Sequence, residues 1–126
     1  MILYAASTAP DTDFTAKLVD VHPDGRAFNL CDGIIRARCR KGLDDPELLT
    51  PNTVESYEID LWVTSNVFKA GHRIRVEISS SNFPRFDRNP NSGLPFGTDT
   101  ELHQATQTIY HTAQYPSHIL LPVIPR

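Results

Sequence analysis

Polar and apolar side chains alternate strictly through residues 73–78 of this 126-residue chain. The two isoleucines and the valine of this segment would share one face of a strand, and its two arginines and its glutamate would share the other. Gly71 can begin the strand from a turn, and Pro84 must end it because proline has no N–H to donate to a neighbouring strand. The pattern therefore predicts a strand with one buried face and one face in water.

Turn signals divide the rest of the chain into further segments of strand length. Residues 22–25, with the sequence His-Pro-Asp-Gly, form a turn because proline presets φ and glycine accepts a positive φ. Pro122 predicts an edge position or a bulge for the last segment. The further strands are expected over residues 2–7, 12–22, 26–31, 34–39, 54–63, 104–111 and 118–124, with a break or bulge at Asp32 and Gly33.

No segment shows helical apolar spacing over more than two turns, although residues 64–70 could hold one helical turn. Many short strands separated by turns are typical of a β-sandwich. The length of the chain is that of one domain. We therefore expect a single all-β domain over residues 1–126, with a long surface loop over residues 89–101.

Charge and cysteine content argue against several classes of function. The formal net charge is −3 at pH 7, with acidic and basic residues interleaved, which argues against an electrostatic nucleic-acid binder. No apolar run approaches the length of about 20 residues that a membrane span requires, so a soluble, cytoplasmic protein is expected. Cys31 and Cys39 are expected as free, buried thiols, because a disulfide would require the turn at residues 32–33 to bring them together.

The chain lacks the Gly-x-Ser-x-Gly motif that carries the nucleophile of α/β-hydrolases. Ser79, Ser80 and Ser81 follow a strand pattern and have no flanking glycines. The five histidines lie in turns and near strand ends. A serine, a histidine and an aspartate are not expected to converge at hydrogen-bond distance from such positions, and no catalytic residue is assigned.

Two aspartates, Asp11 and Asp13, would point to the same side of a strand and, with Asp20 and Asp24, could supply oxygen ligands to calcium. No loop, however, carries such ligands at regular spacing. The simpler expectation is that Asp11 caps a turn and that Asp13 pairs with an arginine. Neither a metal nor a cofactor is therefore predicted.

Several long segments resemble one family of enzymes. Residues 71–89, Gly-His-Arg-Ile-Arg-Val-Glu-Ile-Ser-Ser-Ser-Asn-Phe-Pro-Arg-Phe-Asp-Arg-Asn, are similar to the C-terminal β-domain of the CocE/NonD (cocaine-esterase-like) hydrolases, a domain of the X-Pro dipeptidyl-peptidase C-terminal type. Residues 11–25, 32–38, 64–71 and 116–122 agree with that domain in the same order. The resemblance implies a jelly-roll, galactose-binding-like β-sandwich that lacks its opening strands. It also implies a parent serine hydrolase, an esterase or dipeptidyl-peptidase, whose catalytic residues cannot be placed on this chain.

The resemblance further implies a partner, the α/β-hydrolase catalytic domain, on which the β-domain packs and whose substrate cleft it helps to wall. The loop after the alternating strand is rich in the aromatic and arginine residues that interfaces favour. Its two phenylalanines would be buried anchors at the contact, although they could instead only plug the end of the sandwich. The candidate contact residues are Asn82, Phe83, Arg85, Phe86, Asp87 and Arg88. Missing strands would also leave unpaired edges, which predicts self-association of the chain.

A stand-alone carbohydrate-binding module is the alternative function. Jelly rolls often bind sugars by stacking them on exposed aromatic rings. Trp62 is the main candidate for such stacking, and Tyr57, Phe83 and Phe86 are the others. Trp62 could equally pack against a neighbouring loop or domain.

Overall fold

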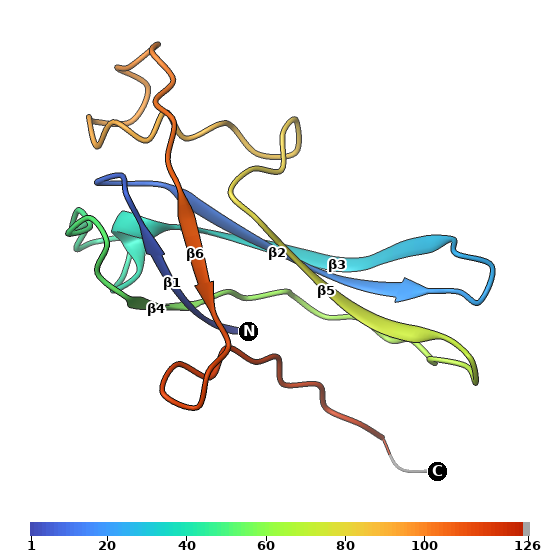
Figure 1. Cartoon of the computed structure of the whole chain (residues 1–126). Coiled ribbons are helices and arrows are strands. Elements are labelled where there is room, and N and C mark those ends of the chain that lie inside the picture. The colour runs from blue at the N-terminus through green and yellow to red at the C-terminus, as the bar shows by residue number, and fades with distance from the viewer. Residues whose placement is uncertain (125–126) are drawn as a thin grey trace.

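The computed structural model describes residues 1–124 and contains six strands in two antiparallel sheets of three strands each (Figure 1). The strand order is β4-β1-β6 in one sheet and β3-β2-β5 in the other. The elements are β1 (Ile2–Ser7), β2 (Asp13–Val21), β3 (Ala27–Arg36), the 3-10 helix η1 (Ala37–Cys39), β4 (Glu55–Glu58), β5 (Arg73–Ser79) and β6 (Gln107–Tyr110). The predicted all-β sandwich is confirmed, whereas the helical turn allowed for residues 64–70 does not form.

β2 and β3 form a long hairpin that, with β5, extends beyond the other sheet (Figure 1). Its turn is the predicted His-Pro-Asp-Gly segment. Gly25 has a φ of 89°, which glycine adopts without steric cost, and its N–H donates to the carbonyl of His22 at 3.0 Å. Local turn chemistry therefore fixes where this hairpin reverses.

The register of β2 against β3 shifts after Leu18, which lies opposite Cys31, because the next residue of β2 lies opposite Asn29. Leu30 is therefore the extra residue of a β-bulge. The break or bulge expected at residues 32–33 is wrong, since both residues continue the ladder within a single strand.

Gly33 is required by a close approach between backbones. A Cβ atom at this position would lie 1.9 Å from the carbonyl oxygen of Asp60. The chain that follows β4 thus crosses β3 in direct contact with it, and only glycine leaves the necessary space. This crossing keeps Ile59 and Leu61 in the core, although β4 ends at Glu58, before the predicted end of the strand.

β5 contains the alternating segment of residues 73–78. It pairs with β2, with Ile78 opposite Ala16 and Val76 opposite Leu18. Ile78 packs against the core, but Ile74 is 53% exposed. The predicted face is therefore correct in direction and is buried only at one end, because the sheet extends past the layer that covers it.

The β4-β1-β6 sheet has shorter strands than predicted. β6 covers residues 107–110 of the expected segment 104–111. The strand expected over residues 118–124 is wrong for the described structure, where His118 makes a single antiparallel bridge to Ile2. The two prolines that flank His118, Pro116 and Pro122, cannot donate backbone hydrogen bonds, which prevents a longer ladder.

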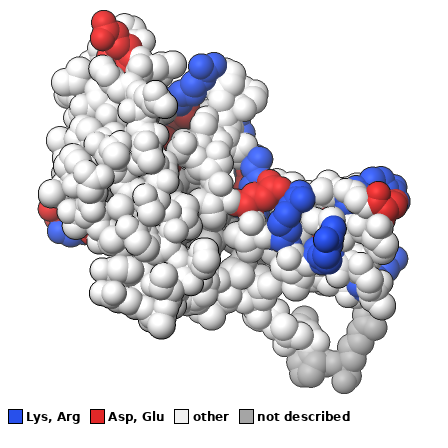
Figure 2. All heavy atoms as spheres, in the orientation of Figure 1, with Lys and Arg blue, Asp and Glu red and all other residues white. Residues whose placement is uncertain are grey.

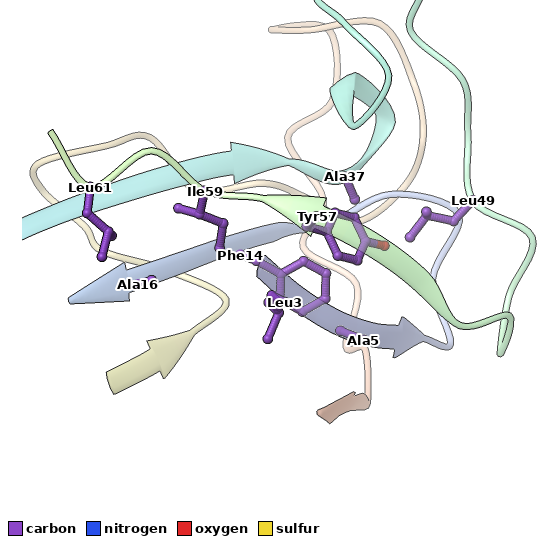
Figure 3. Close-up of a cluster of buried hydrophobic side chains, with 9 residues drawn as sticks. All are labelled: Leu3, Ala5, Phe14, Ala16, Ala37, Leu49, Tyr57, Ile59 and Leu61. Carbon is purple, nitrogen blue, oxygen red and sulfur yellow. The ribbon is translucent and has the colours of Figure 1, made fainter. Parts of the chain in front are cut away.

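The core lies between the two sheets (Figure 3). Phe14 and Tyr57 face each other from the two sheets, with ring centroids 4.7 Å apart. Each large core side chain contributes about 1.5–3 kcal/mol through burial. The buried cluster comprises Leu3, Ala5, Phe14, Ala16, Ala37, Leu49, Tyr57, Ile59 and Leu61.

Both cysteines are free and half-buried. The expectation of free thiols is confirmed, and burial raises the pKa of the Cys31 thiol. Within residues 1–124, the structure contains no helix with the length and apolar character needed to cross a membrane.

Candidate functional site

The beginning of β2 and the end of β3 carry a buried ion pair. Asp13 and Arg36 lie directly opposite each other in the antiparallel ladder. The Arg36 guanidinium donates from Nε to Asp13 Oδ1 at 2.8 Å and from Nη2 to Asp13 Oδ2 at 3.0 Å. The Asp13 side chain is 1% exposed. The hydrogen bonds to Asp13 raise the pKa of Arg36 although burial opposes this rise, so Arg36 is a fixed positive charge at this end of the sandwich.

A second aspartate–arginine pair lies beside the first. Asp11 Oδ1 accepts the backbone N–H of Arg38 at 3.0 Å, and Asp11 Oδ2 accepts the Nε–H of the same residue at 2.8 Å. Arg38 lies in η1, which begins where Ala37 donates its backbone N–H to the carbonyl of Thr12. As expected from the sequence, Asp11 caps a turn and Asp13 pairs with an arginine. Two of the four carboxylates considered as calcium ligands are thus bound to guanidinium groups.

A single amide fastens the loop after β5 to both pairs. Asn89 Nδ2 donates to Asp11 Oδ2 at 3.0 Å and to Asp13 Oδ1 at 2.9 Å. Asp87 accepts from Arg36 Nη2 at 3.3 Å. The position of this loop is therefore set by hydrogen bonds to buried charges.

Phe96 covers the two arginines. The guanidinium carbons of Arg36 and Arg38 each lie 4.8 Å from the centroid of its ring, within the range of a cation–π interaction. The same side chains, with those of Asp87 and Arg88, line a hollow of about 100 Å³. Ligand pockets usually measure about 300–1,000 Å³, so this hollow is too small for a substrate.

The predicted contact residues divide into two groups. The first group binds the loop to β3, because Asn82 Nδ2 and Arg85 Nε both reach Asp32 Oδ2, at 3.0 and 2.9 Å. The Arg85 guanidinium carbon also lies 5.3 Å from the ring centroid of Phe86. Phe86 is half-buried and, with Leu43, borders an apolar hollow of about 280 Å³.

The second group points outward. The guanidinium carbon of Arg88 lies 4.6 Å from the ring centroid of Phe83, and Phe83 is 59% exposed. Within this chain, Phe83 therefore does not plug the end of the sandwich. Its aromatic ring, stacked with the guanidinium of Arg88, is exposed at the surface of the loop.

Trp62 belongs to a different surface. It is 80% exposed and lines a groove of about 530 Å³ to which the contact loop contributes no residue. Leu120 and Leu121 line the same groove. Tyr57, another aromatic considered for sugar stacking, is fully buried in the core. The structure therefore does not bring the candidate stacking residues together into one site.

This arrangement supports binding and offers no assembled nucleophile. Within residues 1–124, no serine hydroxyl is hydrogen-bonded to a histidine ring. Ser79 Oγ accepts the backbone N–H of Ser81 at 3.3 Å. The histidine that meets a carboxylate most closely, His72 with Asp20, has no serine hydroxyl as a third member in the described residues.

The sequence interpretation missed four members of the site: Arg36, Arg38, Asn89 and Phe96. The signal for the arginines was present, since Arg-x-Arg at residues 36–38 and Asp-x-Asp at residues 11–13 each place two like charges on one side of the chain. A hairpin would bring the two pairs together. Asn89 and Phe96 gave no such signal because their loop has no periodicity.

The fold and the site define the chain as a β-sandwich whose loop after β5 is held by hydrogen bonds to buried carboxylates. Its family is that of the X-Pro dipeptidyl-peptidase C-terminal non-catalytic domains, whose sequence profile matches residues 1–120. The chain belongs to this family, and the predicted resemblance is confirmed.

Known relatives agree with this assignment. The chain is 51% identical over 126 residues to the cocaine esterase of Rhodococcus sp. (strain MB1 Bresler), an alignment that covers 98% of this chain and 22% of that protein. Among solved structures, it resembles an aminopeptidase from a marine sediment archaeon, Thaumarchaeota archaeon, with a TM-score of 0.85 at 35% identity over 91% of this chain and 21% of the other. It also resembles an alpha-amino acid ester hydrolase, with a TM-score of 0.82 at 31% identity over 90% and 20%. The chain thus spans about a fifth of the length of these relatives.

Proposed function

We propose that this chain is the supporting β-sandwich of a serine hydrolase, where it packs on an α/β-hydrolase catalytic domain and helps to wall the substrate cleft. The family is non-catalytic, and the relatives are named as an esterase, an aminopeptidase and an ester hydrolase. The parent protein would cleave an ester or amide bond through an acyl-serine formed in its other domain. This chain would contribute a surface to that reaction.

The observation that carries the proposal is the outward pair of Phe83 and Arg88. Aromatic residues, phenylalanine included, and arginine are enriched at protein interfaces. The loop that presents them is held by Asn89 on two buried carboxylates. A partner would therefore bind a preorganised surface and would lose little free energy in ordering it.

A second surface supports the same role. Residues 102–124 contain no lysine, arginine, aspartate or glutamate. Figure 2 shows a broad face without charged side chains on the side of the molecule that carries β6. Leu102, Leu120 and Val123 are 62%, 78% and 83% exposed. Depletion of charge with exposed apolar side chains is typical of surfaces that a partner buries.

The alternative of a carbohydrate-binding module rests on Trp62. Its ring is exposed, as sugar stacking requires, and its groove is lined both by the exposed apolar side chains Val63 and Leu120 and by the polar side chains Glu58, Asp60, Thr64 and Asn66. Sugar hydroxyls need several polar partners around the ring. We favour a protein partner for this surface because large apolar side chains, Val63 and Leu120, are exposed beside Trp62, and saturable binding to a glycan array that is lost in Trp62→Ala would reverse this choice.

The proposal can be tested in a chimera in which this chain replaces the matching segment of the 51% identical cocaine esterase. Phe83→Ala is introduced both into the chimera and into the chain on its own. Since Phe83 is already exposed in the single chain, its loss there should change stability little. In the chimera the same substitution should remove about 2 kcal/mol of stabilisation, as at an interface hot spot, and lower esterase kcat/KM.

Val67→Ala is the matched control, because Val67 is also apolar and 56% exposed but lies outside the loop. It should leave the chimera unchanged. Equal effects of Phe83→Ala in the chimera and in the single chain would contradict the proposal, since the ring would then serve the sandwich alone.

On its own, the chain should also self-associate through its uncovered surfaces and sheet edges. Size-exclusion chromatography over a range of concentrations would show the apparent mass rising with concentration. A strict monomer at the highest concentration would contradict this part of the proposal.

A further inference from the structure

Two histidines and an aspartate meet at the end of the β3-β2-β5 sheet, away from the contact loop. Asp20 and His22 are two residues apart at the end of β2, so their side chains lie on the same face. His72 precedes Arg73, which pairs with Val21, so His72 lies across from His22. Strand pairing alone therefore brings one carboxylate and two imidazoles together.

The distances between these groups are short. His72 Nδ1 lies 2.9 Å from Asp20 Oδ1 and 3.1 Å from Oδ2, and His22 Nε2 lies 3.8 Å from Oδ2. The ligand atoms of the three residues all lie within 4.8 Å of one another. The two imidazole centroids are 4.2 Å apart.

We propose that Asp20, His22 and His72 bind a divalent transition-metal ion of the zinc type. Zinc–nitrogen and zinc–oxygen bonds of about 2.0–2.2 Å place the ligand atoms of a tetrahedral site about 3.3 Å apart. The observed separations of 2.9 and 3.8 Å lie on either side of that value. A small rotation of the His22 ring completes a three-ligand site, with water as the fourth ligand.

The ligand set selects the class of metal. Two imidazoles and one carboxylate suit zinc, cobalt, nickel and copper, whereas calcium and magnesium require mostly oxygen ligands. One carboxylate with two neutral imidazoles leaves a single negative charge for the cation. This chemistry differs from that of the Asp11 and Asp13 carboxylates, which are neutralised by arginines.

Burial and packing prepare the site. The side chains of Asp20 and His72 are 8% and 10% exposed, whereas that of His22 is 28% exposed and gives access from solvent. The ring of Phe28 packs on the His22 ring, with centroids 4.7 Å apart. The hydrogen bond between His72 and Asp20 already joins the residue before β5 to β2. Within residues 1–124 His22 makes no side-chain hydrogen bond, so its ring nitrogens remain available to a metal ion.

A metal ion bound at this site would stabilise the fold. A bound ion would join the turn of the β2–β3 hairpin to the first residues of β5, at the end of the sheet that the other layer leaves uncovered. Binding to the folded state alone stabilises it in proportion to the logarithm of the metal concentration.

The test is a titration of the full chain, purified without a polyhistidine tag, with Zn²⁺ by calorimetry and with Co²⁺ by visible absorbance. We expect one ion per chain, with the intense d–d bands of a tetrahedral site for Co²⁺. His22→Ala and His72→Ala should each weaken Zn²⁺ binding at least 10-fold. His111→Ala, which removes an exposed histidine outside the cluster, should leave binding unchanged, and Ca²⁺ should not bind.

Thermal melting with and without Zn²⁺ provides a second readout. Zn²⁺ should raise the melting temperature of the wild-type chain and of His111→Ala but not that of His22→Ala, which replaces a half-buried turn residue and should fold. The proposal is overturned if the wild-type chain does not bind Zn²⁺ at micromolar concentrations. It is equally overturned if His22→Ala retains wild-type affinity.

Discussion

Arg36 binds Asp13 through two hydrogen bonds, 2.8 and 3.0 Å long, across the pairing that joins the end of β3 to the beginning of β2. The same aspartate accepts a hydrogen bond from Asn89. One buried carboxylate thus links the hairpin to the loop that carries the candidate contact residues. The stability of the sandwich and the shape of its proposed interface therefore depend on the same ion pair.

Asp13→Asn should lower the free energy of unfolding by about 3 kcal/mol, because it leaves a largely buried guanidinium without its main partner. Urea denaturation measures this change. The control is Asp24→Asn, which removes a solvent-exposed pair with Arg26 and should have little effect. Similar losses of unfolding free energy in the two variants would show that the buried Asp13 pair stabilises the fold no more than an exposed pair does.

Asn89→Ala should release the loop and leave the sandwich folded. Its amide donates hydrogen bonds to Asp11 and Asp13 at 3.0 and 2.9 Å, and alanine cannot replace them. Hydrogen exchange followed by mass spectrometry should show faster exchange, by 10-fold or more, in residues 82–97 and unchanged exchange in β2. Asn29→Ala, an exposed position on β3, is the control. Unchanged exchange in the loop would contradict the role given to Asn89.

Gly33→Ala should be strongly destabilising, by about 3 kcal/mol or more, since the new methyl group would lie 1.9 Å from the carbonyl oxygen of Asp60. The crossing chain would have to move, and with it Ile59 and Leu61. Chemical denaturation of the variant gives the loss. A variant as stable as the wild type would mean that the two backbones do not approach each other as the structure shows.

Tyr57 should make the protein sensitive to alkali. Burial raises the pKa of Tyr57 from the usual 10.0 of a tyrosine to about 12. The folded state therefore keeps this proton between pH 10 and pH 12 while the unfolded chain loses it. Stability from this group is fully present below pH 10 and falls above it, by about 2–3 kcal/mol at pH 12.

Tyr57→Phe should remove this part of the alkaline loss, measured by unfolding at several pH values. Within residues 1–124 the Tyr57 hydroxyl has no hydrogen-bond partner, so the substitution should also raise stability at neutral pH by about 1 kcal/mol. Tyr115→Phe, which removes a half-buried hydroxyl outside the core, is the control. An unchanged alkaline profile in Tyr57→Phe would refute this explanation.

The alternation of residues 73–78 correctly predicted β5 and its direction, because a period of two is a local property of the chain. The exposure of Ile74 could not be predicted, since it depends on how far the opposite sheet reaches. The strand expected over residues 118–124 failed for a related reason. Its apolar residues match a strand, but pairing depends on a partner edge and on the N–H groups that its prolines lack.

The candidate loop was found from its composition, and Phe83 and Arg88, which the structure places at its surface, were among the candidates named. The way in which the loop is held could not be deduced. It depends on Asp11 and Asp13 reaching across the hairpin to Arg36 and Arg38, and on Asn89 joining them from far along the chain. The cluster of Asp20, His22 and His72 likewise arises from the β2–β5 pairing, which no local pattern specifies.

We propose that this chain contributes a surface to a hydrolase whose reacting groups lie in another domain. The most direct test is the rate at which the purified chain hydrolyses a p-nitrophenyl ester, with and without a serine-directed inhibitor. The rate should equal that of buffer alone and should not change with the inhibitor. Saturable turnover that the inhibitor abolishes would contradict this proposal.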